Sequence, residues 1–216
     1  MTCFSARAPA LSKYRVRRLF QPLVSSLALL FARIGLRPNH VTVASLITTV
    51  FASVSLALDL PLMYGILLFT SGLLDGVDGA LARLTGSSSS WGGFLDSLSD
   101  RYADVIAIIG FLFWKEMKGF KLLFPVELWV ALAVAGFLMV SYVRSEGEGV
   151  GVPLDVGLAA RSERLLILST SSMLYPLAWF SPCLGLIVCC VLAHLTAIYR
   201  FVFASVKLKL RYEDSS

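Results

Sequence analysis

The chain has 216 residues, of which 57% are hydrophobic and 15% are charged. This composition is too apolar for an ordinary soluble domain, and the chain is too long for a protein with one membrane span. The formal net charge of +5 fits a surface that meets anionic lipid headgroups. Nucleic-acid binding is disfavoured, because the basic residues flank apolar segments. We therefore expect one polytopic membrane domain over residues 1–216.

The first patterned stretch, residues 13–37, has a basic start followed by spaced leucine and phenylalanine side chains. This pattern is typical of an amphipathic helix that lies in a membrane interface, here on the cytoplasmic face. A short first span is the alternative, which Pro22 and the pair Ser25–Ser26 disfavour. The helix should end before Pro38, because proline cannot continue it, and Asn39 can cap the next helix.

Between residues 41 and 204 the hydropathy predicts a bundle of six membrane spans. Most of them approach the ~20 residues with which an α-helix crosses a bilayer. The expected spans are Val41–Leu58, Pro61–Arg83, Gly92–Trp114, Pro125–Arg144, Ser162–Ala178 and Cys183–Ala204. The predicted fold is therefore all-α, with six transmembrane helices and an N-terminal interfacial helix.

Lysine and arginine are distributed unequally between the two sides of this bundle. One side would hold the basic residues up to Arg37, the 144–164 loop and the basic C-terminal segment. The other side would hold three lysines, Lys115, Lys118 and Lys121. The excess of positive charge places the first side and both termini in the cytoplasm of an integral cell-membrane protein.

Two stripes of small and acidic residues lie on either side of a short loop at the cytoplasmic end. The first stripe follows helical spacing and consists of Asp75, Asp78, Gly79, Ala82 and Arg83. The second stripe has steps of four residues and consists of Gly92, Asp96 and Asp100. Gly86 and four serines, Ser87–Ser90, lie between the stripes and suit a loop. A helical hairpin would bring two carboxylates against two more.

Four carboxylates so close together repel one another unless cations neutralise them. Ligation by carboxylates alone suits Mg²⁺ or Mn²⁺ rather than zinc. Gly79 and Ala82 leave room for a flat group, and Arg83 supplies a cation suited to phosphate. Solvated helix ends paired with basic residues are the alternative. The cost of charges in membrane segments, ~2.5–3.5 kcal/mol each, disfavours it.

The spacing D-x2-D-G-x2-A-R-x8-G-x3-D-x3-D resembles the signature of the CDP-alcohol phosphotransferase family, and every fixed position is filled. The hydropathy of the whole chain is also similar to that of the family's membrane domain. The resemblance implies that a CDP-linked lipid donates a phosphatidyl-type group to an alcohol and that CMP leaves. It also implies a homodimer.

The resemblance gives roles to the signature residues. Two divalent ions, Mg²⁺ or Mn²⁺, would be held by Asp75, Asp78, Asp96 and Asp100. The CDP moiety would contact Asp75, Asp78, Gly79, Ala82, Arg83 and Gly92. Asp100 is the candidate general base, because it is farthest along its stripe and can face the acceptor hydroxyl.

Four arginines are expected at the same membrane end as the carboxylates, namely Arg144, Arg161, Arg164 and Arg200. Arginines on three helices at one depth indicate a site for an acceptor phosphate, and anchoring to lipid headgroups is the alternative. The runs Ser141–Arg144 and Arg161–Leu166 resemble the branch of the family that makes phosphatidyl- or archaetidylinositol phosphate from inositol 1-phosphate. Glycerol 3-phosphate as acceptor and CDP-inositol as donor are the alternatives.

Two other functions have to be weighed against an enzyme. Carboxylates within membrane segments also mark transporters and ion pathways, but the inverted repeats expected of transporters are not visible in the sequence. A non-catalytic lipid-binding homologue is disfavoured by the presence of all four acids and Arg83. The signature itself does not specify the alcohol or the ester or ether linkage of the lipid.

Overall fold

The computed structural model describes residues 15–119, 123–154, 156–157 and 160–213, and its elements are helices. The α-helices are α1 (Arg15–Arg33), α2 (Pro38–Ala57), α3 (Pro61–Thr85), α4 (Ser90–Ile109), α5 (Lys115–Gly119), α6 (Val126–Gly149), α7 (Arg161–Met173) and α8 (Ser181–Glu213). A 3₁₀ turn, η1 (Gly110–Leu112), follows α4. Residues 13–14 of the expected interfacial stretch and Lys121 lie outside the described residues. The prediction of an all-α protein is confirmed.

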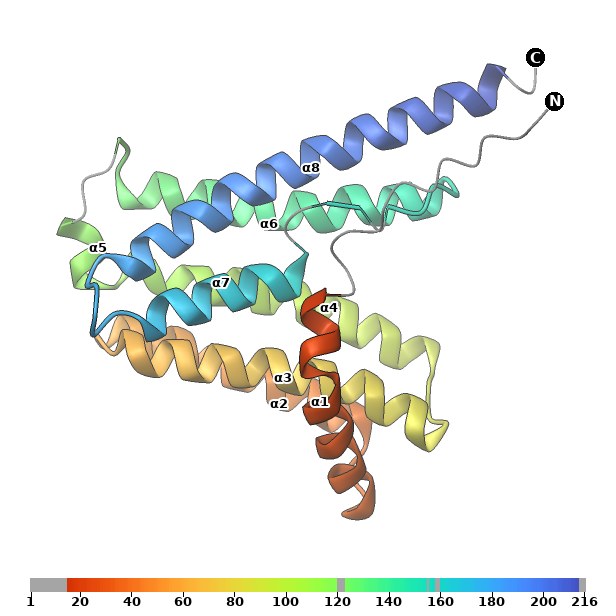
Figure 1. The fold of residues 1–216 in the computed structure, drawn as a ribbon, viewed down its shortest axis with the longest axis horizontal. Helices are drawn as coiled ribbons and strands as arrows, with labels where there is room; N and C mark the ends of the chain where they lie inside the picture. The colour runs from red at the N-terminus through yellow and green to blue at the C-terminus, as the bar shows by residue number, and fades with distance from the viewer. Residues whose placement is uncertain (1–14, 120–122, 155, 158–159, 214–216) are drawn as a thin grey trace.

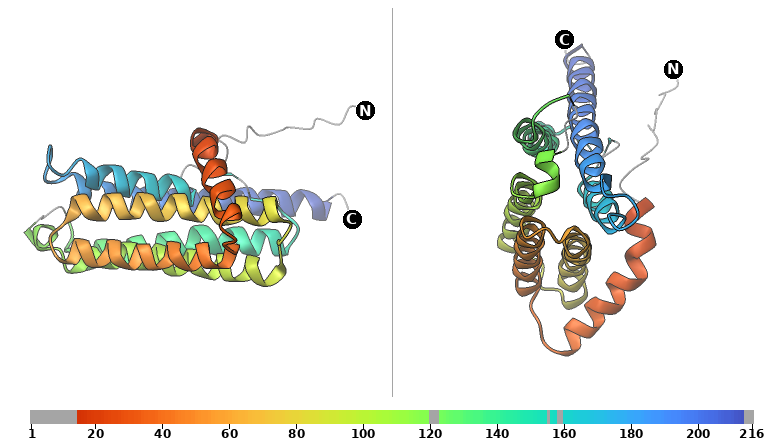
Figure 2. Two further views of the ribbon diagram at one scale, coloured as in Figure 1. Left: turned by 90° about the horizontal axis from the view of Figure 1, so that it is seen from below. Right: turned by 90° about the vertical axis from the view of Figure 1, so that its left-hand side faces the viewer.

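Helices α2, α3, α4, α6, α7 and α8 run side by side, and successive helices alternate in direction (Figure 1). One end of the bundle therefore carries the start of α2, the α3–α4 loop, the start of α7 and the C-terminal end of α8. Helix α1 runs across the bundle helices rather than along them (Figure 2).

Local sequence explains the tight α3–α4 connection. Gly86 ends α3 in the left-handed conformation, with φ 64°, and its N–H donates to the carbonyl of Ala82. Ser89 caps α4, because its hydroxyl accepts the N–H of Gly92 at 3.0 Å. These two caps reverse the chain between α3 and α4. The two helices make few direct contacts with each other, because α2 packs against both of them, so the expected hairpin is held together through α2.

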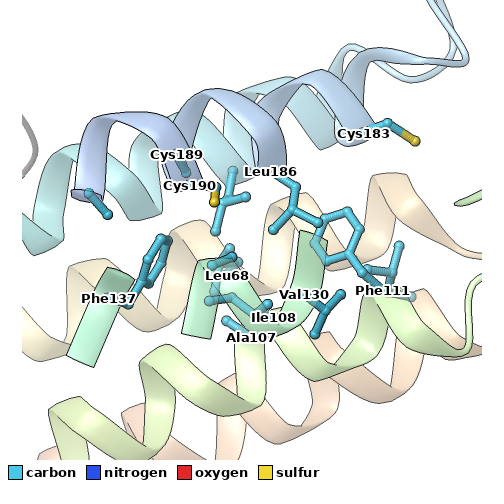
Figure 3. Packing of buried hydrophobic residues seen from close by; sticks show 14 of the residues in the cluster. Leu68, Ala107, Ile108, Phe111, Val130, Phe137, Cys183, Leu186, Cys189 and Cys190 are labelled. Atoms are coloured by element: carbon cyan, nitrogen blue, oxygen red, sulfur yellow. The ribbon is translucent and has the colours of Figure 1, made fainter. Parts of the chain in front are cut away.

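The largest hydrophobic core lies where α3, α4, α6, α7 and α8 meet. Leu68 of α3, Ile108 of α4 and Phe137 of α6 face Leu186 and Cys189 of α8 in this core (Figure 3). The cysteines of α8 are buried free thiols that pack like small apolar side chains. The core lies along the middle of the bundle and leaves the end with the α3–α4 loop to polar side chains.

Four helices, α2, α3, α6 and α8, are long and apolar enough to cross a membrane. Four expected span ends differ from the structure. Helix α4 ends at Ile109 rather than at Trp114, and α8 continues past Ala204 to Glu213. Helix α7 ends at Met173 rather than at Ala178, so its 13 residues span only about 20 Å. Helix α6 continues past Arg144 and ends at Gly149. Within this extension, Arg144 forms an ion pair at 2.9 Å with Glu148, which lies one turn further along the helix. Hydropathy alone missed this polar extension.

Helix α1 packs against the half of α3 that carries the first acidic stripe. Ala28 of α1 is buried with Val77 and Leu81 of α3. Gly76 permits this approach, because a Cβ at this position would lie 3.3 Å from Cγ2 of Val24. Other apolar side chains of α1 remain exposed, among them Leu19, which is 74% exposed. The helix thus covers the back of the acidic stripe with one face and leaves apolar side chains outside.

A second glycine sets the distance between α3 and α7. A Cβ at Gly65 would lie 2.7 Å from the carbonyl oxygen of Ser169 and 2.9 Å from the backbone nitrogen of Met173. Both contacts involve the α7 backbone, which cannot rotate away as a side chain can. Gly65→Ala should therefore lower the free energy of unfolding by about 1–3 kcal/mol, as other overpacked cores do.

Thermal unfolding of the purified protein in detergent checks this expectation. Gly149→Ala is the matched control, because a Cβ at Gly149 meets nothing within 4 Å. The control should be neutral or slightly stabilising, since alanine favours a helix over glycine. A melting temperature of Gly65→Ala equal to that of the control would contradict the close packing of α3 on α7.

Candidate active site

A pocket of about 190 Å³ opens at the end of the bundle, between the start of α2, the end of α3, the α3–α4 loop and the start of α4. It is lined by Pro38, Asn39, Thr42, Asp78, Gly79, Ala82, Arg83, Ser87, Ser88, Ser89, Gly92, Gly93 and Asp96. Five of the six residues expected to contact CDP are in this lining. The sixth, Asp75, lies one turn earlier on the same stripe of α3.

Small residues keep the pocket open. A Cβ at Gly92 would lie 3.1 Å from the hydroxyl oxygen of Ser89 and 3.3 Å from Oδ1 of Asn39. A Cβ at Gly79 would lie 3.4 Å from a guanidinium nitrogen of Arg83. Any larger side chain at these two positions would therefore fill space between α2, α3 and α4.

Three of the four predicted metal ligands converge at the edge of the pocket, and two of them, Asp78 and Asp96, line it. One carboxylate oxygen each from Asp75, Asp78 and Asp96 lies within 4.8 Å of the others. Asp78 is oriented by two donors, since Thr42 donates to its Oδ2 at 2.6 Å and the N–H of Gly79 donates to its Oδ1 at 2.5 Å. This set of oxygen donors fits a hard divalent cation.

Asp100, the fourth predicted ligand, is paired with an arginine. Nη1 of Arg161 lies 2.7 Å from Oδ1 of Asp100 and 2.6 Å from Oδ1 of Asp75. Helix α7 therefore supplies a positive charge between the two acidic stripes. The roles of Asp100 as metal ligand and as general base stay predictions.

The structure brings Arg161 to the carboxylates but places the other three predicted arginines differently. Arg164 is 1% exposed, and its Nη2 lies 2.7 Å from Oδ2 of Asp104. Arg200 is buried and donates to the carbonyl oxygens of Val156 and Val140, both at 2.7 Å.

Arg144 pairs with Glu148 on the exposed part of α6. The four arginines therefore do not form one open ring. An acceptor-binding role for Arg144, Arg161, Arg164 and Arg200 stays a prediction, and the burial of Arg164 against Asp104 makes it the least accessible of them.

Two contributors to the site were missed by the sequence analysis. Asp104 continues the four-residue spacing of Asp96 and Asp100, so the sequence carried a signal for it. Thr42 lies 36 residues before Asp78, and no local pattern connects the two. Only the packing of α2 against α3 reveals that a hydroxyl holds this carboxylate.

A family model described as CDP-alcohol phosphatidyltransferase matches residues 36–191. The chain belongs to this family. An archaetidylinositol phosphate synthase of Methanothermobacter thermautotrophicus is 34% identical over 198 residues, which cover 90% of this chain and 92% of the relative. An archaetidylinositol phosphate synthase of Pyrococcus horikoshii is 33% identical over 206 residues, which cover 93% of this chain and 99% of the relative. Both relatives belong to the branch that the arginine-containing runs resemble.

Solved structures share the fold of this CDP-alcohol phosphatidyltransferase. The phosphatidylinositol phosphate synthase of Mycobacterium tuberculosis with CDP-DAG bound superposes with a TM-score of 0.73 at 22% identity, covering 85% of this chain and 94% of that one. The same synthase in complex with manganese and citrate gives a TM-score of 0.71. The predicted enzyme class is confirmed by the family match, and the transporter alternative is not supported.

The carboxylate cluster gives the first test of the transferase site. Asp75→Asn and Asp96→Asn each remove a charged oxygen donor from the three-carboxylate cluster. Replacing a residue that only hydrogen-bonds to a metal ligand lowers metal affinity or activity by about 10–100-fold. Loss of a ligand itself should therefore lower Mn²⁺ affinity and activity by at least ~100-fold. Mn²⁺ binding, followed through the electron paramagnetic resonance signal of free Mn²⁺, and CMP release from a CDP-lipid are the two measurements.

Asp59→Asn is the matched control for these substitutions. Asp59 lies at the other end of the bundle, pairs with Lys115 at 2.7 Å and has a φ of 63°, which asparagine tolerates. Asp100→Asn should abolish turnover but keep part of the Mn²⁺ binding. If Asp100→Asn loses Mn²⁺ as completely as Asp75→Asn does, Asp100 is a ligand and its assignment as the base is wrong.

Proposed function

We propose that this enzyme transfers the lipid phosphate of a CDP-linked lipid to inositol 1-phosphate and releases CMP. The observation that carries the proposal is one juxtaposition at the end of the bundle. A pocket lined by the CDP signature lies beside the three-carboxylate cluster, and Arg161 lies on the far side of that cluster. Nucleotide, diphosphate and a phosphorylated acceptor thus each have a complementary surface.

The pocket suits the nucleotide half of the donor. Gly79, Ala82 and Gly92 would leave the helix backbone open to the cytidine, and Arg83 would contact its phosphates. Asp75, Asp78, Asp96 and, on the family pattern, Asp100 would hold two Mg²⁺ or Mn²⁺ ions. Such ions neutralise a diphosphate and stabilise a phosphate leaving group. The lipid chains would remain between the helices, in the bilayer.

The chemical step needs a base and an oriented acceptor. The acceptor hydroxyl oxygen would attack the lipid phosphorus, the bond to the CMP oxygen would break, and the hydroxyl proton would pass to Asp100. Arg161 lies 2.7 Å from Asp100, so the same guanidinium could hold an acceptor phosphate near the base. Proximity of this kind is what an in-line transfer requires.

The identity of the acceptor is supported by two independent features. Arg161 offers a guanidinium that matches phosphate oxygens, which a neutral alcohol would not require. The relatives that match over nearly the whole chain are synthases of an inositol phosphate lipid. Glycerol 3-phosphate as acceptor and CDP-inositol as donor are the alternatives that the assay must separate, together with ester- and ether-linked lipid donors.

Acceptor competition tests this proposal. The enzyme receives CDP-diacylglycerol or its ether-linked analogue with inositol 1-phosphate, glycerol 3-phosphate, free inositol or serine, and the lipid product is measured. A separate arm replaces the lipid donor by CDP-inositol. Inositol 1-phosphate should give the highest kcat/KM, and efficient use of free inositol or serine would refute the acceptor site.

Arginine variants in the same assay locate the acceptor phosphate. Arg161→Ala should raise the KM for inositol 1-phosphate by about 10–100-fold, because a charge-assisted pair contributes about 1.5–3 kcal/mol, and it should change the donor KM much less. Arg144→Ala and Arg200→Ala test the remaining predicted contacts. Lys209→Ala, an exposed basic residue at the same end of the bundle, is the control for a general effect of charge.

We further propose a membrane arrangement with six spans, in which α4 and α7 join the four apolar helices. Helix α1 would lie in the interface, because it crosses the bundle and leaves leucines exposed. The active site and both termini would face the cytoplasm, and the homodimer rests on the family resemblance alone.

Cysteine labelling of intact cells checks the topology in a cysteine-free background. Ser88→Cys in the α3–α4 loop and Gly149→Cys at the end of α6 should be labelled only after the membrane is permeabilised. Leu177→Cys, between α7 and α8 at the other end, is at a position that is 86% exposed and should react from outside. Labelling of Leu177→Cys and Ser88→Cys from the same side would disprove six spans.

A further inference from the structure

Asp104 lies one helical turn beyond Asp100 on α4 and is outside the family signature. Its side chain is 3% exposed, and its carboxylate faces two arginines of α7. Oδ2 lies 2.7 Å from Nη2 of Arg164, whereas Oδ1 lies 3.4 Å from Nε of Arg161. Asp104 therefore connects a buried arginine to the arginine that reaches the active-site carboxylates.

The start of α7 fixes the direction of both arginines. Glu163 accepts the N–H of Ala160 at 2.8 Å and so closes the first turn of α7. Arg161 and Arg164 are three residues apart and share one face of the helix. The guanidinium carbon of Arg164 lies 4.3 Å from the ring centre of Phe137, in the packed interior. Arg164 is thus a rigid support for Asp104.

Arg161 has contacts that compete with a metal ion. Its Nη1 lies 2.6 Å from Oδ1 of Asp75, and Asp75 is a member of the three-carboxylate cluster. A divalent cation that binds Asp75 must therefore share or displace the guanidinium. Among the described residues, Nε of Arg161 and Oδ1 of Asp104 are both buried and lack a hydrogen bond. The 3.4 Å contact between these two atoms consequently has room to tighten.

We propose that Asp104, supported by Arg164, is a positioning residue that holds Arg161 in the site while Asp75 turns to a divalent cation. When Arg161 releases Asp75, its Nε–H can donate to Asp104, which keeps the guanidinium charge beside Asp100. Without the charge of Asp104, Arg161 stays on Asp75 and competes with the cation. The part of this inference that concerns acceptor binding rests on the proposed function, whereas the part that concerns the cation does not.

A double-mutant cycle tests whether Asp104 acts through Arg161. Mn²⁺ binding to the full-length protein in detergent is measured from the electron paramagnetic resonance signal of free Mn²⁺, for the wild type, Asp104→Asn, Arg161→Ala and the double variant. Asp104→Asn should weaken Mn²⁺ binding by about 10-fold, as loss of an outer-shell partner does. In the Arg161→Ala background the same substitution should change binding by less than about twofold.

Two results of the cycle would overturn the proposal. Unchanged Mn²⁺ binding in Asp104→Asn would show that Asp104 does not restrain Arg161. An equal loss in both backgrounds would show that Asp104 acts on the cation directly through its charge. Asp104→Glu covers the case in which Asp104→Asn fails to fold, since it keeps a charge beside Arg164 and displaces only the carboxylate.

Asp104→Glu separates position from charge. Mn²⁺ binding should weaken by between about twofold and tenfold, because the added methylene shifts the contact with Arg161. If Asp104→Glu binds Mn²⁺ as tightly as the wild type does and has an unchanged melting temperature, the proposal is wrong. In the lipid assay at saturating Mn²⁺, Asp104→Glu should raise the KM for inositol 1-phosphate more than the donor KM. A wild-type protein that makes no lipid from inositol 1-phosphate would refute the proposed function, and the Mn²⁺ cycle would still decide the role of Asp104.

Discussion

Mutual repulsion among carboxylates is the constraint on which this end of the molecule depends. Three acidic side chains converge within 4.8 Å, and two more lie along the next turns of α4. In a protein built mainly of apolar helices, such a group requires positive charge nearby. Arg161 supplies it through ion pairs with Asp75, Asp100 and Asp104. The same ion pairs join α7 to α3 and α4. The contacts that neutralise the carboxylates therefore also hold these helices together.

The sequence predicted the parts of the site that depend on local spacing. Acidic and small residues at steps of three and four fall on one face of a helix wherever that helix packs, so the stripes of α3 and α4 could be read directly. The turn residues Gly86 and Ser89 likewise act within a few positions of themselves. Five of the predicted CDP residues consequently line one pocket.

Features that depend on packing between distant helices could not be predicted in this way. The bond from Thr42 to Asp78 joins α2 to α3, and nothing in either segment indicates it. Hydropathy could not predict the length of α7, because Leu174 to Leu177 continue its apolar run and yet form turns. The four-residue spacing pointed to Asp104, but its contacts in the site are with two arginines that lie about 60 residues further along the chain.

The four arginines show why counting basic residues at one membrane end overestimates an anion site. The described residues between α6 and α7, namely 150–154, 156–157 and 160, belong to no helix or strand, so their carbonyl groups need donors from elsewhere in the protein. Arg200 donates to Val156 at 2.7 Å, and Arg211 donates to Gly151 at 2.9 Å. Two arginines of α8 thus hold the backbone that leads into α7, and Arg164 holds Asp104. Arginine at this end therefore has two observed roles, support of the backbone and neutralisation of carboxylates, and only the partners of each guanidinium distinguish them.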